Sequence, residues 1–103
     1  MTAGGTREAI DPVRFVGNRS SGKMGFAVAE AARDRGAKVT LITAPTALPD
    51  PVGVEVTHIT SAIQMKEAVT KATAKCDALI MAAEVADYMP KSAAWGKIKK
   101  AVA

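Results

Sequence analysis

Helical and extended patterns alternate along this 103-residue sequence, and this alternation limits the possible folds more than any other feature. Apolar residues at helical spacing predict a helix over residues 22–35, followed by a strand over Lys38–Thr43. A second strand is expected over Val54–Ile59, a second helix from Thr60–Ser61 onward, and a further strand over Ala78–Ala83. Short connections between such elements favour a parallel sheet with helices on its faces. The predicted class is therefore α/β, with a Rossmann-like parallel sheet.

The spacing of apolar residues also predicts which helix faces meet the core. These positions are Met24, Ala27, Val28 and Ala31 in the first helix, and Met65, Ala68, Val69 and Ala72 in the second. Ser61 and Gln64 fit a capping box at the start of the second helix. The run Ala78–Ala83 is apolar on both faces, which is typical of a strand in the middle of a parallel sheet.

The first residues resemble the loop that follows a strand, because residues 2–8 are small, polar and contain the pair Gly4–Gly5. An α/β nucleotide-binding domain normally begins with a buried strand before such a loop. We therefore expect the first strand to be missing, and we predict a single, apparently truncated domain over residues 1–103.

The loop Gly17–Gly25 is glycine-rich and polar and runs directly into the first predicted helix. Helix N-termini carry unpaired N–H groups and partial positive charge, which suits phosphate. Ser20, Ser21, Gly22 and Lys23 are candidate phosphate-binding residues, as are Gly4 and Gly5. The alternative is that Ser20 and Ser21 only cap the helix while Lys23 is solvated.

Two standard nucleotide motifs fit poorly. Residues 17–24 nearly match the phosphate-loop pattern G-x-x-x-x-G-K-[ST], but Met24 replaces the hydroxyl residue that would bind Mg²⁺. Pro12 weakens the strand that should precede the loop. The dinucleotide pattern G-x-G-x-x-G is absent, so an NAD(P)-binding Rossmann domain stays an alternative with weak support.

Composition excludes several other classes of protein. The net charge of +4 suits an anionic ligand, but dispersed basic residues and few aromatic ones do not favour nucleic-acid binding. One histidine, His58, and one cysteine, Cys76, do not make a metal site. No apolar run approaches membrane-spanning length, so we expect a cytoplasmic protein without a membrane partner.

Several motifs together resemble phosphopantothenoylcysteine synthetase (phosphopantothenate–cysteine ligase), the C-terminal half of the bacterial bifunctional coenzyme A biosynthesis flavoprotein. The motifs occur in family order, with family-like spacing, over essentially the whole chain. They are residues 2–8 (TAGGTRE), 10–14 (IDPVR), 18–27 (NRSSGKMGFA), 36–41 (GAKVTL), 85–88 (VADY) and 97–100 (KIKK).

This resemblance implies a ligase that uses CTP and Mg²⁺ to activate the carboxylate of 4′-phosphopantothenate as an acyl-cytidylate. The amine of cysteine then forms the amide, and the enzyme works as a homodimer. Asn18 matches an asparagine associated with the intermediate, and Lys97 a lysine that reaches the triphosphate from a flexible flap. By its own features the stretch 91–103 is either such a flap or a solvated tail. The implied nucleotide-binding residues are Met81, Ala82, Ala83 and Asp87, together with Lys97.

The chain also departs from the family pattern at several positions. Glu84 stands where alanine is usual and adds an acid beside the expected nucleotide site. Gly17 replaces a common hydroxyl residue, Met89 a frequent arginine, and Gly96 a common acid. The chain resembles the amino-terminal half of a ligase domain, so a non-catalytic half-domain is the remaining alternative.

Overall fold

The computed structural model describes residues 1–89 and 91, which form short strands and two helices. In chain order the elements are β1 (Thr2–Ala3), β2 (Arg7–Ala9), β3 (Phe15–Gly17), α1 (Lys23–Asp34), β4 (Thr40–Thr43), β5 (Glu55–His58) and α2 (Ala62–Thr73).

The main sheet is parallel, in the order β1–β4–β5. On the other side of β1, residues 80–84 run parallel to it through bridges from Thr2 to Met81 and from Gly5 to Glu84. The spatial order is therefore β5, β4, β1, then residues 80–84. Chain order reverses between β1 and this last segment, and such a reversal marks the ligand crevice of open α/β sheets.

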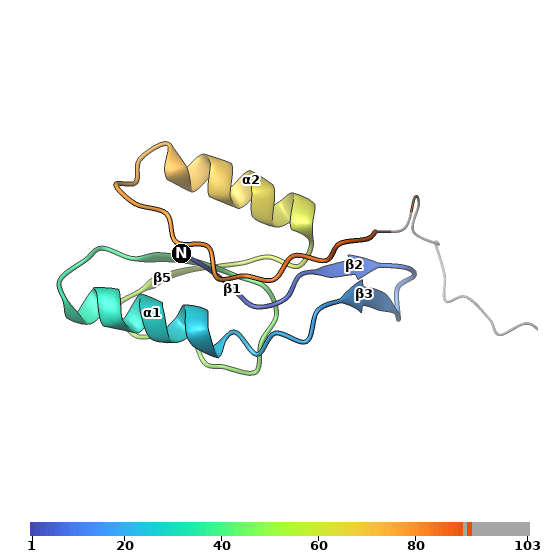
Figure 1. Cartoon of the computed structure of the whole chain (residues 1–103), viewed down its shortest axis with the longest axis horizontal. Helices are drawn as coiled ribbons and strands as arrows, with labels where there is room; N and C mark the ends of the chain where they lie inside the picture. The colour runs from blue at the N-terminus through green and yellow to red at the C-terminus, as the bar shows by residue number, and fades with distance from the viewer. Residues whose placement is uncertain (90, 92–103) are drawn as a thin grey trace, which may run out of the picture.

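Helices cover the sheet, with α1 packing against β1 and α2 against β4. Figure 1 shows β1 and β5 of this sheet between the two helices, with β2 and β3 beyond them to one side. The predicted α/β class, with a Rossmann-like parallel sheet and flanking helices, is confirmed. Neither described helix is long and apolar enough to cross a membrane. The buried core is small and combines Ala3, Phe26, Ala29, Leu41 and Met65 with neighbouring aliphatic side chains.

The buried face of α1 agrees only in part with the predicted one, because Val28 and Ala31 are partly buried but Met24 and Ala27 are not. Gly25, Phe26 and Ala29 are buried, whereas Met24 is 74% exposed and Ala27 is exposed. The reason is close packing: a Cβ added to Gly25 would lie 2.5 Å from the Cβ of Ala3. Glycine lets α1 approach β1, and the aromatic ring one residue later fills the core.

The predictions for α2 are confirmed. Ser61 caps the helix by accepting from the Gln64 amide, and the Gln64 side chain accepts from the Ser61 amide. Met65 is buried, and Ala68, Val69 and Ala72 are partly buried on the same face.

Two residues of the expected first loop, Thr2 and Ala3, form a strand instead. Thr2–Ala3 is itself a strand in the middle of the sheet, and β2 and β3 form an antiparallel hairpin between β1 and α1. Residues 11–14 form a turn before β3, because the buried Asp11 carboxylate accepts from the Val13 and Arg14 amides. At the start of β1 the Met1 ammonium donates to the Thr40 carbonyl (3.1 Å), and burial lowers the pKa of this amino group.

The predicted strand over Ala78–Ala83 is extended and parallel to β1, but it does not lie in the middle of the described sheet. Among residues 1–89 and 91 only β1 pairs with it, so it forms an edge. Leu79, Ile80 and Met81 are 40%, 50% and 62% exposed. An apolar run predicts a strand whose side chains are buried on both faces. The exposure of these three side chains depends instead on which other segments pack against the strand.

Candidate functional site

The carboxyl end of β1 meets residues 81–87 through a continuous set of backbone bonds. The Glu84 amide donates to the Gly4 carbonyl (2.8 Å), and the Thr6 amide donates to the Glu84 carbonyl (2.9 Å). Two buried hydroxyls extend the pairing: Thr2 accepts from the Ala83 amide (3.3 Å) and Thr6 from the Ala86 amide (2.8 Å). The predicted nucleotide-binding residues Met81–Ala83 therefore lie directly beside β1.

Asn18 lies against the glycine pair that ends β1. A Cβ added to Gly5 would lie 2.6 Å from the Asn18 carbonyl oxygen, so only glycine fits there without a shift. Gly4 has a φ of +80°, a conformation that favours glycine. The structure thus brings Asn18 against Gly5, which lies thirteen positions earlier in the sequence.

The serines of the loop before α1 do not cap the helix. Ser20 and Ser21 hydroxyls accept from the Gly22 amide (3.4 Å) and the Lys23 amide (3.3 Å), each two residues ahead. Such bonds shape the turn. The N-cap position itself is Gly22, which has a φ of +78° and provides no side-chain cap. The hydroxyls therefore hold the loop, and the helix end has no side-chain cap of its own.

Gly22 and Gly4 both approach Thr46, which lies in the loop after β4. Added Cβ atoms would lie 2.9 Å and 3.2 Å from its Cγ2. The glycines that a Rossmann fingerprint places in one short run are therefore divided here between the end of β1 and the start of α1. The β2–β3 hairpin separates Gly4 from Gly22 in the sequence, but in the fold both glycines lie beside Thr46. This explains why G-x-G-x-x-G is absent although the close approaches exist.

The near match to a phosphate loop is not supported by the geometry. In that motif the loop follows a strand of a parallel sheet. Here the preceding strand, β3, pairs only with β2 within the described residues, and the pairing is antiparallel.

A cavity of about 470 Å³ opens beside Asn18. Its lining residues are Gly5, Arg7, Phe15, Gly17, Asn18, Arg19, Ser20 and Pro45. The guanidinium carbon of Arg7 lies 4.5 Å from the centre of the Phe15 ring. Among the residues that the structure describes, no carboxylate lines this cavity. Sequence reasoning missed Arg7 and Phe15 as site residues, because the hairpin that aligns them was not predicted.

The other predicted nucleotide-binding residues lie at or beyond this end of the sheet, or outside the described residues. Asp87 is exposed near this end of the sheet, and no hydrogen bond or ion pair involves it within residues 1–89 and 91. Glu84 is exposed, and its backbone bonds to β1. Lys97 and the expected flap over 91–103 lie outside the described residues, apart from Lys91. The binding roles of all these residues stay predictions.

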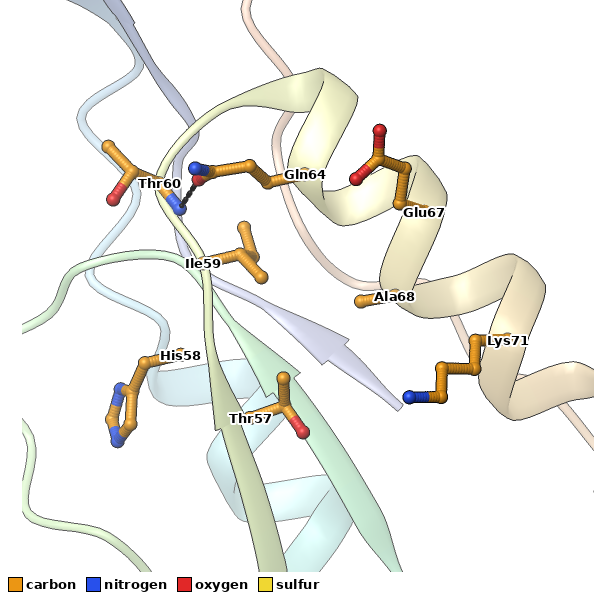
Figure 2. A pocket seen from close by; sticks show the side chains of 8 residues that line it. All are labelled: Thr57, His58, Ile59, Thr60, Gln64, Glu67, Ala68 and Lys71. Atoms are coloured by element: carbon orange, nitrogen blue, oxygen red, sulfur yellow. Dashed lines mark hydrogen bonds between the residues drawn. The ribbon is translucent and has the colours of Figure 1, made fainter.

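A second hollow, of about 490 Å³, lies between the end of β5 and α2. Figure 2 shows Ile59, Ala68 and Lys71 around it, with the Gln64 side chain accepting from the Thr60 amide (2.8 Å). It contains none of the predicted site residues. Three of them, Gly5, Asn18 and Ser20, line the cavity beside Asn18 instead.

Comparison with known proteins agrees with this arrangement. All of residues 1–103 match the family described as "DNA/pantothenate metabolism flavoprotein C-terminal domain". The chain is 61% identical over 103 residues to the coenzyme A biosynthesis bifunctional protein CoaBC of Mycobacterium tuberculosis, covering 99% of this chain and 25% of that protein. The chain thus spans about a quarter of the length of the curated relatives it matches.

Solved structures show the same fold. The crystal structure of the C-terminal domain of a coenzyme A biosynthesis bifunctional protein CoaBC has a TM-score of 0.83 at 53% identity, covering 88% of this chain and 46% of that one. The DNA/pantothenate metabolism flavoprotein from Streptococcus pneumoniae has a TM-score of 0.80 at 35% identity, covering 86% of this chain and 40% of that one. The chain therefore belongs to the family of DNA/pantothenate metabolism flavoprotein C-terminal domains.

Proposed function

We propose that this chain provides the amino-terminal half of a phosphopantothenate–cysteine ligase domain in coenzyme A biosynthesis. The observation that carries the proposal is the meeting of Gly4–Gly5, Asn18 and residues 81–84 at the reversal point of the sheet. Ligands of open α/β sheets bind at this place. Relatives named for coenzyme A biosynthesis share more than half of the residues.

The proposed reaction has two steps. A carboxylate oxygen of 4′-phosphopantothenate attacks the α-phosphorus of CTP, and pyrophosphate leaves. The amine of cysteine then attacks the acyl carbon of the acyl-cytidylate, CMP leaves, and a proton is released from nitrogen. Both steps require several negative charges to be held close together, so positioning and electrostatic stabilisation provide most of the catalysis.

Each predicted residue has a role in this proposal that suits its chemistry. Asn18 contacts the reacting carboxylate, because an amide donates and accepts hydrogen bonds without adding charge. Backbone groups of Met81, Ala82 and Ala83 bind the cytosine, and Asp87 binds the nucleotide. The positive N-terminal end of the α1 dipole attracts phosphate, since no acid occupies the first turn of α1. Lys97 reaches the triphosphate.

The Mg²⁺ ion of this reaction is assigned to the triphosphate. Within residues 1–89 and 91 no group of three or more His, Cys, Asp or Glu side chains could hold a metal ion. Mg²⁺ commonly keeps several waters and binds substrate phosphates with only one or two carboxylates.

The proposal also covers the remainder of the ligase domain, the homodimer and the flap. Because the chain covers 46% of the solved C-terminal domain, turnover is expected to need the remainder of such a domain. The protein is proposed to work in the cytoplasm as a homodimer, with residues 91–103 as the flap that carries Lys97.

A ¹H–¹⁵N correlation spectrum of the 103-residue chain tests nucleotide recognition. Mg²⁺ with CTP should shift amide peaks of Gly4, Gly5 and Gly22, whereas NADP at equal concentration should not. Larger shifts with NADP would favour the alternative of an NAD(P)-binding domain. A folded chain indifferent to both nucleotides would favour the non-catalytic half-domain and would refute nucleotide recognition by this half.

A further inference from the structure

The Thr6 side chain lies where the chain after β1 stops pairing with residues 80–84. Up to this point the two segments follow a parallel ladder, in which the Glu84 amide donates to Gly4 (2.8 Å) and the Thr6 amide to Glu84 (2.9 Å). The next bond of such a ladder would join the Ala86 amide to the Thr6 carbonyl. Instead, the Thr6 hydroxyl accepts from the Ala86 amide (2.8 Å). A side chain thus replaces the main chain where the ladder ends.

The ladder ends because the chain leaves the sheet directly after Thr6. Arg7 begins β2, and its amide donates to the Thr60 carbonyl (2.7 Å). Thr6 itself is fully buried, with 0% of its surface exposed. Its branched Cβ restricts the side-chain torsion, so the buried hydroxyl is held in one direction. The bond to the Ala86 amide is therefore a fixed point of the fold.

This bond is the last one before Asp87, the acid predicted to bind the nucleotide. Within residues 1–89 and 91, no hydrogen bond or ion pair holds Asp87, Tyr88 or Met89. All three residues are exposed. The direction of the Asp87 carboxylate therefore depends on the backbone that precedes it, and the nearest fixed atom of that backbone is the Ala86 amide nitrogen.

Thr6 also borders the other side of the candidate site. A Cβ added to Gly17 would lie 2.9 Å from the Thr6 carbonyl oxygen, so the backbone before Asn18 runs close to Thr6. The amide and the hydroxyl of Thr6 hold residues 84–86. One buried residue thus lies between the Asn18 side of the site and the predicted nucleotide side.

We propose that Thr6 is a positioning residue, whose hydroxyl fixes residues 85–87 so that the Asp87 carboxylate meets the nucleotide. This inference rests on the proposed ligase function, in which Asp87 binds CTP. Loss of the hydroxyl removes no group that touches the nucleotide. It lets the backbone before Asp87 adopt other conformations, and the apparent affinity falls with the fraction of chains in the competent one.

A ¹H–¹⁵N titration of the 103-residue chain with Mg²⁺ and CTP tests this role. Thr6→Val retains the branched shape but not the acceptor, and should weaken CTP binding about 3–10-fold, the effect of one hydrogen bond on such a population. Without ligand, the Ala86 amide of this variant should exchange with solvent several-fold faster. Thr6→Ser retains the hydroxyl and should bind CTP within about twofold of the wild type.

A matched control separates positioning from stability. The Thr43 hydroxyl is also buried in the sheet, but it donates to the Ala44 carbonyl (2.8 Å). Thr43→Val should therefore reduce stability without changing the affinity for CTP. Circular dichroism checks that each variant is folded. If Thr6→Val unfolds the chain, Thr6→Cys and Thr6→Ser decide, because sulfur is a weak acceptor: weaker CTP binding by Thr6→Cys supports the proposal, and equal binding overturns it.

A double variant shows whether Thr6 acts through Asp87. Asp87→Asn should weaken CTP binding by itself, since it removes the charge of the acid. On that background, Thr6→Val should weaken binding further by less than about twofold, because residues that act through one another are not additive.

The proposal is overturned if folded Thr6→Val binds CTP as tightly as the wild type, if Thr6→Ser is as weak as Thr6→Val, or if Thr6→Val and Asp87→Asn are additive. A folded wild-type chain that binds no CTP would also overturn it. CTP binding that depends on Thr6, in a protein without amide formation, would refute the proposed ligase function alone. CTP binding and amide formation that are both insensitive to Thr6→Val would refute this inference alone.

Discussion

Replacing Gly25 by alanine places two known effects in opposition at one position of α1. Alanine is favoured over glycine inside a helix by about 0.8–1 kcal/mol, so propensity alone predicts stabilisation. In the structure, however, the new Cβ would lie 2.5 Å from the Ala3 Cβ and 3.0 Å from the Thr2 carbonyl oxygen. Carbon atoms in contact prefer about 3.5–4.0 Å, so α1 would have to move about 1 Å away from β1.

The size of the net effect follows from what surrounds the contact. Overpacking of a core costs about 1–3 kcal/mol. Both nearest atoms belong to a central strand, and Ala3 is fully buried, so no flexible side-chain end can yield. We therefore expect the upper part of this range, and after subtraction of the propensity gain a net loss of about 1–2 kcal/mol.

Urea unfolding followed by circular dichroism measures this loss. Ala27→Gly, on the exposed face of the same helix, isolates the propensity effect and should cost about 1 kcal/mol. Ala3→Gly removes the nearest atom, so the double variant with Gly25→Ala should lose less stability than the sum of the two single variants. Stabilisation by Gly25→Ala, or strict additivity in the double variant, would refute the packing argument.

Three further predictions concern other parts of the molecule. Gly5→Ala places a Cβ 2.6 Å from the Asn18 carbonyl oxygen, so the Asn18 amide peak should shift without any ligand; an unchanged spectrum would contradict this. Glu8→Ala removes the acceptor of the Ala62 amide and should cost about 1–2 kcal/mol in urea unfolding, with Glu8→Gln costing less; equal losses would show that the hydrogen bond is not responsible. Burial lowers the pKa of the Met1 amino group below its ordinary value of 8.0. The unfolded chain therefore binds more protons between the folded pKa and 8.0, and stability should rise with pH through this window. N-terminal acetylation should abolish that rise, and an identical pH profile in the acetylated chain would refute it.

Local patterns predicted the elements whose causes are themselves local. The start of α2 needs only Ser61 and Gln64 three residues apart, and both bonds of the capping box form. Gly36 follows α1 with a φ of +90°, as expected for a residue that ends a helix. The strands before and after the 44–53 loop were also placed correctly to within two residues.

The burial of a residue was predicted less well where it depends on segments that are distant in the sequence. Met24 continues the apolar spacing of α1, yet it is exposed because Gly25 and Phe26 face β1. Residues 79–81 are as apolar as a central strand, but their exposure depends on how many strands lie beside them. Periodicity reports the hydrophobicity of a segment, and it contains no information about which other segment will cover it.

The sequence by itself determined the α/β class, the two helices, the parallel strands and the candidate residues, because these follow from periodicity, caps and short motifs. Only the tertiary structure decided that Gly5 and Asn18 meet, and that Arg7 stacks on Phe15 beside their cavity. These contacts depend on the hairpin inserted between β1 and α1. Its strands are three residues long and pair across a turn organised by one buried carboxylate, so no apolar period marks them in the sequence.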